Sequence, residues 1–441
     1  MKLFRDAFIL FRNWLEVSGP LRRRQRRPNN PSPRGTSPRR YLIVPPDPHA
    51  PSGSLGDVAM LCAFIGSIRG CEPEASFTLV GARPGKVNLP GFGEITVAAA
   101  WEGREGSRQF DRLIREHDAL YVLGADILDG HYGASTVCRI ASYCNHAVKL
   151  GVPATVLGFS FNSNPRRPCV HALSRLDPAV RVNVRDPQSL ARFLQRVGSR
   201  ADLCADVAFL LPASPQGEAR IESWIAHVRH LGRLVVGVNI NAHAFSAVIE
   251  EIGAHALVAA ITGQLVEAAR QQKLAYLLLP HDSKPQSGDI KLLSALEAEI
   301  RRQGMKELAY FESADPAQIK RVAGLLDLVV TGRMHLAIAS LGAQTPVLAI
   351  AYQDKFEGLF CDHFELPSAT ILYPEQCLDR GLAERLAWAI ARRDDARRRI
   401  KARLPQVMAL ARKNLPPCNG VPVNDAGSVA PDHGPGGEGD G

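Results

Sequence analysis

Residues 325–360, LLDLVVTGRMHLAIASLGAQTPVLAIAYQDKFEGLF, decide the fold that the sequence predicts. Residues 327–331, DLVVT, are rich in β-branched side chains, which is typical of a short buried strand. Gly332 ends this strand, and residues 336–341 have helical character. A second apolar run at residues 347–351 predicts another strand. The segment is therefore a strand, loop, helix and strand unit.

Arg333 and His335 lie where the first of these strands passes into the helix, and Lys355 follows the second strand. In open α/β sheets, ligands bind at the carboxyl ends of the strands. Exposed N–H groups at a helix N-terminus favour an anion. A lone Arg or Lys is usually a solvated surface charge, and a lone His is usually structural. The combination favours an anion site.

The basicity of the chain belongs to its N-terminal arm. Residues 1–40 hold eleven Lys or Arg against two acidic residues, which equals the net charge of +9 of all 441 residues. Residues 41–441 are therefore formally neutral. A nucleic-acid-binding protein concentrates basic residues on its folded body, so we expect no nucleic-acid partner.

The N-terminal arm combines two patterns. Residues 2–17 place Leu, Phe and Trp near one face of a predicted amphipathic helix. Residues 22–40 are rich in Arg, Pro and Asn, which is typical of disorder. Together they fit attachment to an anionic membrane surface. The alternative, with equal weight, is that the arm is disordered without a partner or that the start codon is wrongly assigned.

The nine cysteines contain no C-x-x-C pair and no Cys and His spacing of a zinc site, so we expect no metal. Their odd number and the apolar surroundings of several of them indicate a reducing cytoplasm. No apolar run reaches the roughly 18 residues of a transmembrane helix, and charges interrupt any secretory signal. We expect a cytoplasmic protein, peripheral at the inner face of the membrane if the arm binds lipid.

Strands alternate with helices along the rest of the chain, which predicts α/β domains with parallel sheets. We expect one Rossmann-like domain at residues 41–232 and a second at residues 233–414, facing each other across a cleft. Residues 415–441 are rich in Gly, Pro and Asp, and we expect a disordered tail there.

Polar residues recur at the predicted carboxyl ends of the strands. The series is Asp57, Asp126, Asp129, Ser160, Asn162, Arg185, Asp186, Asn239, His281, Arg333, His335 and Lys355. Such a series on one edge of two sheets describes a cleft. Its cations come mostly from the second half and suit a small, multiply charged anion. Its acids come mostly from the first half and suit sugar hydroxyls or a general base. His243 and His363 are weaker candidates, which we interpret as surface or capping histidines.

Several common motifs are missing from the sequence. The turn at residues 53–57 lacks the G-x-G-x-x-G spacing of a dinucleotide site, and a helix N-cap role for Asp57 is its structural alternative. The sequence has no Walker A motif, no H-E-x-x-H motif and no G-x-S-x-G elbow.

The order of the motifs resembles the polysaccharide pyruvyl transferase family. The matching pieces are Gly56-Asp57, Gly124-Ala-Asp126 to Gly130, Gly158-Phe-Ser160-Phe-Asn162, Val184-Arg185-Asp186, Ala205-Asp206, Leu279-Pro280-His281-Asp282, Thr331-Gly-Arg333-Met-His335 and Tyr352-Gln-Asp-Lys355. The resemblance covers roughly residues 41–390. Ser54 and Ala125 depart from the Asn and Gly that are frequent in the family.

The resemblance implies a glycosyltransferase-B-like fold and transfer of a pyruvyl group from phosphoenolpyruvate to two sugar hydroxyls, as a ketal, with release of phosphate. It implies a role in the biosynthesis of exopolysaccharide or another cell-surface glycan. The acceptor, a glycan or lipid-linked oligosaccharide, would lie on the first domain and the donor on the second. Phosphoenolpyruvate is the donor substrate, and no cofactor is expected.

The residue types support this chemistry. Phosphoenolpyruvate carries a carboxylate and a phosphate, so we expect Arg333 as its anchor, with Arg185 and Lys355 binding the remaining charge. Ketal formation requires a proton for the enol methylene. His335 is the best general acid or base, because an unperturbed histidine has a pKa of about 6.5, and His281 is second.

The acceptor side is expected to use acidic and hydroxyl residues. Asp57 or Asp126 would position or deprotonate the acceptor hydroxyl, and Ser160 and Asn162 would help to bind the sugar.

Two other functions remain open from the sequence. A nucleotide-sugar-dependent glycosyltransferase of the same architecture would use the same helix N-terminus, but it should also offer an acidic residue for the ribose. Glu357 is the nearest candidate and follows a Lys. A non-catalytic glycan-binding or membrane scaffold protein would show no response to phosphoenolpyruvate.

Overall fold

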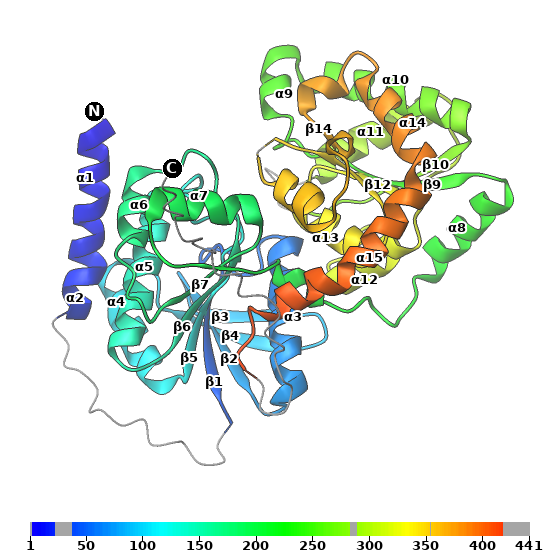
Figure 1. The fold of residues 1–441 in the computed structure, drawn as a ribbon. Helices are drawn as coiled ribbons and strands as arrows, with labels where there is room; N and C mark the ends of the chain where they lie inside the picture. The colour runs from blue at the N-terminus through cyan, green and yellow to red at the C-terminus, as the bar shows by residue number, and fades with distance from the viewer. Residues whose placement is uncertain (1, 23–37, 283–288, 353, 418–441) are drawn as a thin grey trace, which may run out of the picture.

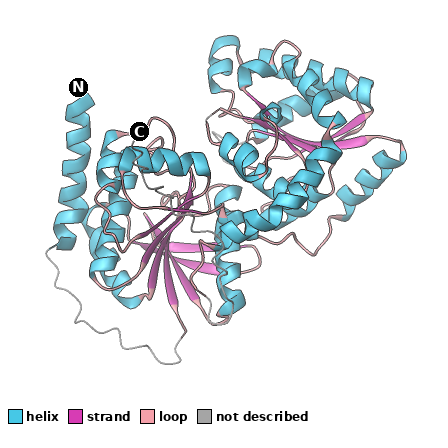
Figure 2. Cartoon of the chain, viewed as in Figure 1, coloured by secondary structure: helices cyan, strands magenta, loops and turns pink. Residues whose placement is uncertain are grey.

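The computed structural model describes residues 2–22, 38–282, 289–352 and 354–417. The described chain forms two α/β domains, each with a sheet between helices (Figures 1 and 2). The predicted fold class is confirmed, since nearly all strand neighbours are parallel. Most of the predicted disordered arm and tail lies outside the described residues.

The first sheet has eight strands in the order β3-β4-β2-β1-β5-β6-β7-β8. They are β1 (Arg40–Val44), β2 (Ser76–Gly81), β3 (Gly85–Leu89), β4 (Gly93–Ala99), β5 (Ala119–Val122), β6 (Ala154–Phe159), β7 (Arg181–Val184) and β8 (Asp202–Leu203). The central strands are continuous apolar runs, such as the fully buried ALYV of β5. Helices on both faces of a parallel sheet produce this pattern.

Strands β3 and β4 are missing from the sequence prediction. They pair in antiparallel orientation at one edge of the sheet, which is otherwise parallel. Gly91 in the connecting turn and Gly93 at the start of β4 have positive φ angles of 77° and 70°, which glycine adopts without steric cost. Exposed charges such as Lys86 and Glu94 interrupt the hydrophobic pattern that marks a strand.

The second sheet has six parallel strands in the order β11-β10-β9-β12-β13-β14. They are β9 (Leu234–Asn239), β10 (Leu274–Leu278), β11 (Leu308–Tyr310), β12 (Leu328–Thr331), β13 (Val347–Ile350) and β14 (Ile371–Leu372). Counted along the chain, this is the 3-2-1-4-5-6 order of a Rossmann-like sheet. The first sheet has the same order from β4 to β7. Ligands bind where such an order reverses, here beyond β1 and β5 and beyond β9 and β12.

Helices cover both sheets. Those of the first half are α3 (Leu55–Cys71), α4 (Gly103–Glu116), α5 (Ala134–Lys149), α6 (Arg167–Leu173), α7 (Pro187–Val197) and the 3-10 turn η2 (Val207–Leu210). Those of the second half are α8 (Ala219–His230), α9 (Ser246–Ile252), α10 (Ala254–Gln272), α11 (Ile290–Arg302), α12 (Pro316–Gly324), α13 (Met334–Gly342), η3 (Gly358–His363), η4 (Ser368–Thr370), η5 (Pro374–Cys377), α14 (Gly381–Ala391) and α15 (Arg393–Arg412). Helix α8 precedes the predicted domain boundary at residues 232–233 and packs against β9 of the second sheet.

The N-terminal segment is partly built into the first domain. Helix α1 (Lys2–Asn13) lies in the segment for which the sequence predicts a helix, and η1 (Trp14–Ser18) and α2 (Gly19–Arg22) continue it. Val17 and Leu21 are buried in the core of the first domain. Glu16 forms an ion pair with Arg139 of α5 at 3.1 Å. These contacts fix α1 along the outer side of the first domain (Figure 1).

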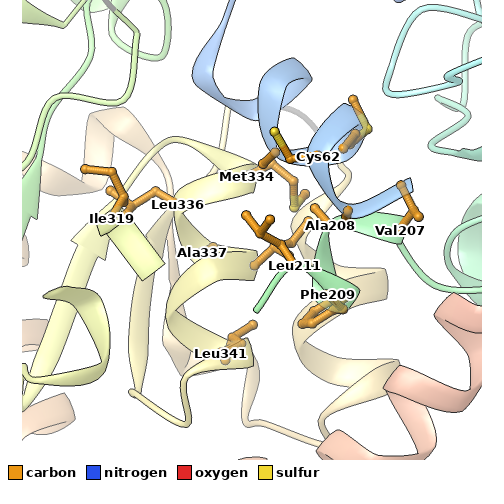
Figure 3. Packing of buried hydrophobic residues seen from close by; sticks show 14 of the residues in the cluster. Cys62, Val207, Ala208, Phe209, Leu211, Ile319, Met334, Leu336, Ala337 and Leu341 are labelled. Atoms are coloured by element: carbon orange, nitrogen blue, oxygen red, sulfur yellow. The ribbon is translucent and has the colours of Figure 1, made fainter. Parts of the chain in front are cut away.

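One hydrophobic cluster runs through both domains and holds them together (Figure 3). Cys62 of α3 and Phe209 of η2 come from the first half, and Met334 and Ala337 of α13 come from the second. Burial of apolar surface drives this contact. It places the N-terminal ends of α3 and α13 beside each other, at the carboxyl ends of both sheets.

The chain returns to the first domain after α15 (Figure 1). The side chain of Asn414 donates to the Ala205 carbonyl and accepts from the Gly158 amide, both at 2.8 Å. Asn414 is fully buried, and a buried amide is costly unless its hydrogen bonds are made. This residue therefore ties the end of the described chain to the strand ends of the first sheet.

Among the described residues, no single helix has both the length and the apolar composition needed to cross a membrane. Helices α9 and α10 meet the criterion only when taken together, across a bend of 108°.

Candidate active site

A cavity of about 630 Å³ opens between the two domains at the carboxyl ends of both sheets. Its lining comes from the loops after β1, β5, β7, β9, β10, β12 and β13. The lining residues used below are Asp57, Asp126, Tyr132, Arg185, His243, His281, Asp282, Arg333, His335, Tyr352 and Lys355. Most of the predicted site residues therefore meet in one cavity.

Two helix N-termini face each other across this cavity. The first turns of α3 and α13 both line it. A Cβ atom added to Gly56 would overlap the ring of His335, so only glycine allows the two helices to come this close. The amides of Met334 and His335 have no intrahelical acceptor, because they belong to the first turn of α13. The two helix ends give the cavity a positive partial charge.

His335 adjoins a chain of buried polar side chains. Its Nε2 atom lies 3.5 Å from Oδ2 of Asp206. The same oxygen accepts a 2.9 Å hydrogen bond from Arg185, whose Nε donates to Ser160 Oγ at 2.7 Å. Burial alone would raise the pKa of Asp206, but His335 and Arg185 lower it to about 2. Asp206 is therefore an ionised carboxylate beside the imidazole of His335.

Arg333 is held by two carboxylates. Asp289 Oδ1 accepts hydrogen bonds from its Nε at 3.0 Å and from its Nη2 at 2.6 Å. Asp282 Oδ2 lies 3.3 Å from the same Nη2. Burial alone would lower the pKa of Arg333, but Asp289 and Asp282 raise it. The guanidinium is therefore charged and fixed where it lines the cavity.

His281 is a buried neutral histidine beside this pair. Its backbone amide donates to Asp289 Oδ2 at 2.8 Å, and that oxygen also accepts from Asn239 Nδ2 at 2.7 Å. Both ring nitrogens of His281 are buried without a hydrogen-bond partner among the described residues. Burial, with the charges of His335 and Arg333, lowers the pKa of His281 to about 3. Its imidazole can therefore donate or accept one hydrogen bond to a ligand without carrying charge.

Lys355 bridges the two domains. Its Nζ donates to Asp126 Oδ2 at 2.7 Å and to the Tyr352 hydroxyl at 3.2 Å. Burial alone would raise the pKa of Asp126, but the charges of Lys355 and Arg185 hold it well below its usual range. Burial alone would lower the pKa of Lys355, and Asp126 and Tyr352 raise it. Both groups are charged, and Asp126 is a poor proton acceptor.

The remaining predicted residues differ in their placement. Asp57 lines the cavity in the first turn of α3, whose N-cap is Ser54: the Ser54 hydroxyl accepts from the Asp57 amide at 3.1 Å. The N-cap alternative for Asp57 is therefore wrong. Ser160 is buried behind Arg185, and Asn162 lies away from the cavity lining.

The two weaker histidines also have defined places. His243 lines the cavity and packs edge-on against Tyr352, with ring centroids 4.9 Å apart, so its interpretation as a surface residue is wrong. His363 is buried, and its Nε2 lies 2.8 Å from the carbonyl oxygen of Arg185. It supports the backbone that carries a site residue.

Each predicted cation has a carboxylate partner, which the sequence analysis did not foresee. Arg185 pairs with Asp206, Arg333 with Asp289, and Lys355 with Asp126. The cavity is therefore not a bare cationic pocket. The paired acids fix the position of each cation, and the two helix N-termini add positive potential where an anion can approach.

The described residues contain no group of three or more His, Cys, Asp or Glu side chains that is arranged to hold a metal ion.

A sequence profile of the family described as polysaccharide pyruvyl transferase matches residues 34–354. The chain belongs to the polysaccharide pyruvyl transferase family. The match includes almost every cavity residue and ends one position before Lys355.

Solved structures similar to this family member share its fold. A Listeria monocytogenes protein, described provisionally as a UDP-N-acetylglucosamine 2-epimerase, has a TM-score of 0.54 and 10% sequence identity, covering 86% of this chain and 96% of its own. The Anabaena protein HepE, solved in complex with UDP-glucose, has a TM-score of 0.52 and 13% identity, covering 85% and 98%. These similarities support the predicted glycosyltransferase-B-like fold. No curated protein sequence matches the chain.

Sequence reasoning missed two acids of this pyruvyl transferase family member. Asp206 appeared only within a family motif, although it follows the last strand of the first sheet, bonds Arg185 and lies 3.5 Å from His335. Asp289 was not singled out, because nothing in the sequence marks its pairing with Arg333, 44 residues away. The one available signal for Asp289 in the sequence was its position directly before a predicted helix.

Proposed function

We propose that the protein transfers the pyruvyl group of phosphoenolpyruvate to two hydroxyls of one sugar, forming a ketal and releasing phosphate. The observation that carries the proposal is the position of His335. It lies between two helix N-termini, beside an ionised Asp206, in a cavity that also presents Arg333 and Lys355. An imidazole beside a carboxylate and an anion-binding surface suits protonation of an enol phosphate.

The donor would bind on the second domain. Arg333 has a guanidinium fixed by Asp289, so little side-chain entropy is lost when it grips a carboxylate or phosphate. The first-turn amides of α13 add hydrogen-bond donors for the same anion. Lys355 and Arg185 face the anion from the other side of the cavity.

The proposed reaction balances without another reactant. The imidazolium of His335 gives its proton to the methylene carbon of phosphoenolpyruvate, and a cation develops at the neighbouring carbon. One sugar hydroxyl attacks that carbon, and its proton restores the imidazolium. The bond from the same carbon to the phosphate oxygen then breaks, and phosphate leaves with the electron pair. The second hydroxyl attacks and its proton leaves with phosphate. The enol phosphate supplies both the electrophile and the leaving group, so we propose no separate cofactor.

The structure favours different roles for the predicted acids and bases. His335 is the stronger candidate for the general acid, because its ring lies beside the ionised carboxylate of Asp206. His281 stays neutral and would act as a hydrogen-bond partner of the donor. Asp126 would position an acceptor hydroxyl rather than deprotonate it, because its pKa is held low. Asp57 is the remaining candidate base on the first domain.

The test is transfer from phosphoenolpyruvate to candidate lipid-linked oligosaccharides, which we propose as acceptors in exopolysaccharide assembly. Mass spectrometry should show a glycan that has gained one pyruvate minus one water, together with an equal amount of free phosphate. His335→Ala should abolish both. Release of UDP from UDP-glucose, or no thermal shift with phosphoenolpyruvate, would oppose the proposal.

The nucleotide-sugar alternative has little support from the site. Glu357, its candidate for ribose binding, does not line the cavity and accepts a 2.7 Å hydrogen bond from the exposed Tyr373 hydroxyl. Incubation with UDP-glucose and the same acceptors should therefore give no glucosylated product.

We propose that the enzyme works at the cytoplasmic face of the membrane. Phe8, Phe11 and Trp14 of the N-terminal helix remain exposed, at 62%, 57% and 47%. Aromatic side chains of this kind insert into the interfacial layer of a bilayer. A surface groove of about 1210 Å³ between α1, α6 and α7 adds the exposed side chains of Arg166 and Arg167, which suit anionic headgroups.

A further inference from the structure

Three aromatic side chains, those of Tyr132, Tyr352 and His243, line the cavity and form an aromatic wall. Tyr132 comes from the first domain, in the loop after β5, and Tyr352 and His243 come from the second. The rings of Tyr132 and His243 lie 6.5 Å apart at an angle of 33°. His243 meets Tyr352 edge-on, with centroids 4.9 Å apart. The wall therefore spans both domains.

Tyr132 is the exposed member of this wall. Its side chain is 53% exposed, and it is the one large exposed apolar side chain of the described residues that lines the cavity. Exposed aromatic surface in a polar cavity is unfavourable unless a ligand covers it. His131 packs edge-on against one side of the ring at 4.8 Å, which fixes its orientation.

Charged groups adjoin the aromatic wall and would meet the hydroxyls of a ligand. Lys355 Nζ lies 4.9 Å from the centre of the Tyr352 ring and also bonds Asp126. Asp126 and Tyr132 both come from the loop after β5 and line the same cavity. A flat apolar face beside a fixed carboxylate is the combination that a pyranose ring requires, because the ring has an apolar C–H face and hydroxyls at its edge.

We propose that Tyr132 forms the acceptor subsite, on which a hexopyranose ring stacks with its edge hydroxyls directed to Asp126. The inference rests on the proposed function for its place in the reaction, but the binding of a sugar face to Tyr132 can be tested alone. The acceptor class is then a neutral pyranose residue with an accessible C–H face.

Two variants and one control test the subsite by binding. Saturation-transfer NMR with methyl glycosides of glucose, galactose and mannose reports which sugar protons contact the protein. Wild type and Tyr132→Phe should transfer saturation to the ring C–H protons, and Tyr132→Ala should reduce the transfer several-fold. Tyr373→Ala removes an exposed tyrosine outside the cavity and should match wild type. Equal signals in Tyr132→Ala and wild type, or no signal from any glycoside, would overturn the subsite.

Kinetics separate this inference from the proposed function. In the transfer assay, Tyr132→Ala should raise the acceptor KM at least tenfold, about 1.4 kcal/mol, with the KM for phosphoenolpyruvate unchanged and Tyr132→Phe close to wild type. An equal rise in both KM values would refute the subsite while the transfer reaction stands. Absence of transfer by wild type would refute the proposed function, and the NMR result would then decide the subsite.

Discussion

Asp289 fixes the guanidinium of Arg333 through two hydrogen bonds to one carboxylate oxygen, at 3.0 and 2.6 Å. Asp289 is fully buried and is also held by Asn239 and by the backbone of His281. The orientation of Arg333 is therefore set before any ligand arrives. Preorganised cations of this kind bind anions with less entropic cost.

Arg333→Lys should weaken binding of phosphoenolpyruvate by at least about tenfold, or about 1.4 kcal/mol. Lysine keeps the charge but loses the planar fork that Asp289 holds. Isothermal titration calorimetry with phosphoenolpyruvate measures the change. Arg321→Lys is the matched control, because Arg321 also bonds a carboxylate through Nε, that of Glu222, outside the cavity. Unchanged affinity in Arg333→Lys would remove Arg333 from the donor site.

Gly56→Ala should lower kcat by about 100-fold, because the added methyl group would displace the ring of His335 and misplaced catalytic groups carry costs of that order. Phosphate release from phosphoenolpyruvate measures the effect. Gly70→Ala in the same helix is the control, since a Cβ there meets open space. It should keep full activity and gain up to about 1 kcal/mol of stability. Full activity of Gly56→Ala would show that His335 tolerates displacement.

His281 should make the protein acid-sensitive. Its pKa is about 3 in the folded protein and about 6.5 when unfolded. Below about pH 6.5 the unfolded chain binds a proton that the folded protein does not, so stability falls as the pH drops towards 3. Between pH 7 and pH 5 the loss is about 2 kcal/mol. Urea unfolding should show this loss in wild type and a smaller one in His281→Gln. The exposed His255→Gln variant should follow wild type.

Binding to anionic vesicles should depend on the aromatic face of α1 and η1. Changing Phe8, Phe11 and Trp14 together to Ser should reduce co-sedimentation with phosphatidylglycerol vesicles at least tenfold, because the inserted apolar area is lost. Soluble transfer activity should be unchanged, since these residues lie outside the cavity.

The matched control for the vesicle experiment changes Leu231, Ile252 and Tyr373 to Ser, three other exposed apolar side chains. It should sediment like wild type. Equal loss in both triple variants would indicate nonspecific hydrophobic adsorption, and no loss in either would remove α1 from the membrane contact.

Many of the site residues could be predicted because they directly follow a strand in the sequence. Arg333, His335 and Lys355 follow strands directly, and strand ends in such sheets meet at one edge. The same logic located Asp126 and Arg185. It failed for Ser160 and Asn162, which also follow a strand but lie behind or beside the cavity, because the direction of a loop side chain depends on what packs against it.

The sequence by itself determined the α/β class, the cations at the strand ends and the glycine at position 56. These follow from hydrophobic periodicity and from backbone sterics, which act within a few residues. The tertiary structure alone decided that Arg185, Arg333 and Lys355 each have a carboxylate partner. It also placed Asp206 beside His335, 129 residues away, and Tyr132 beside His243 across the cleft. Electrostatic and aromatic contacts depend on distance in space, and only the packing of α3 against α13 brings those groups together.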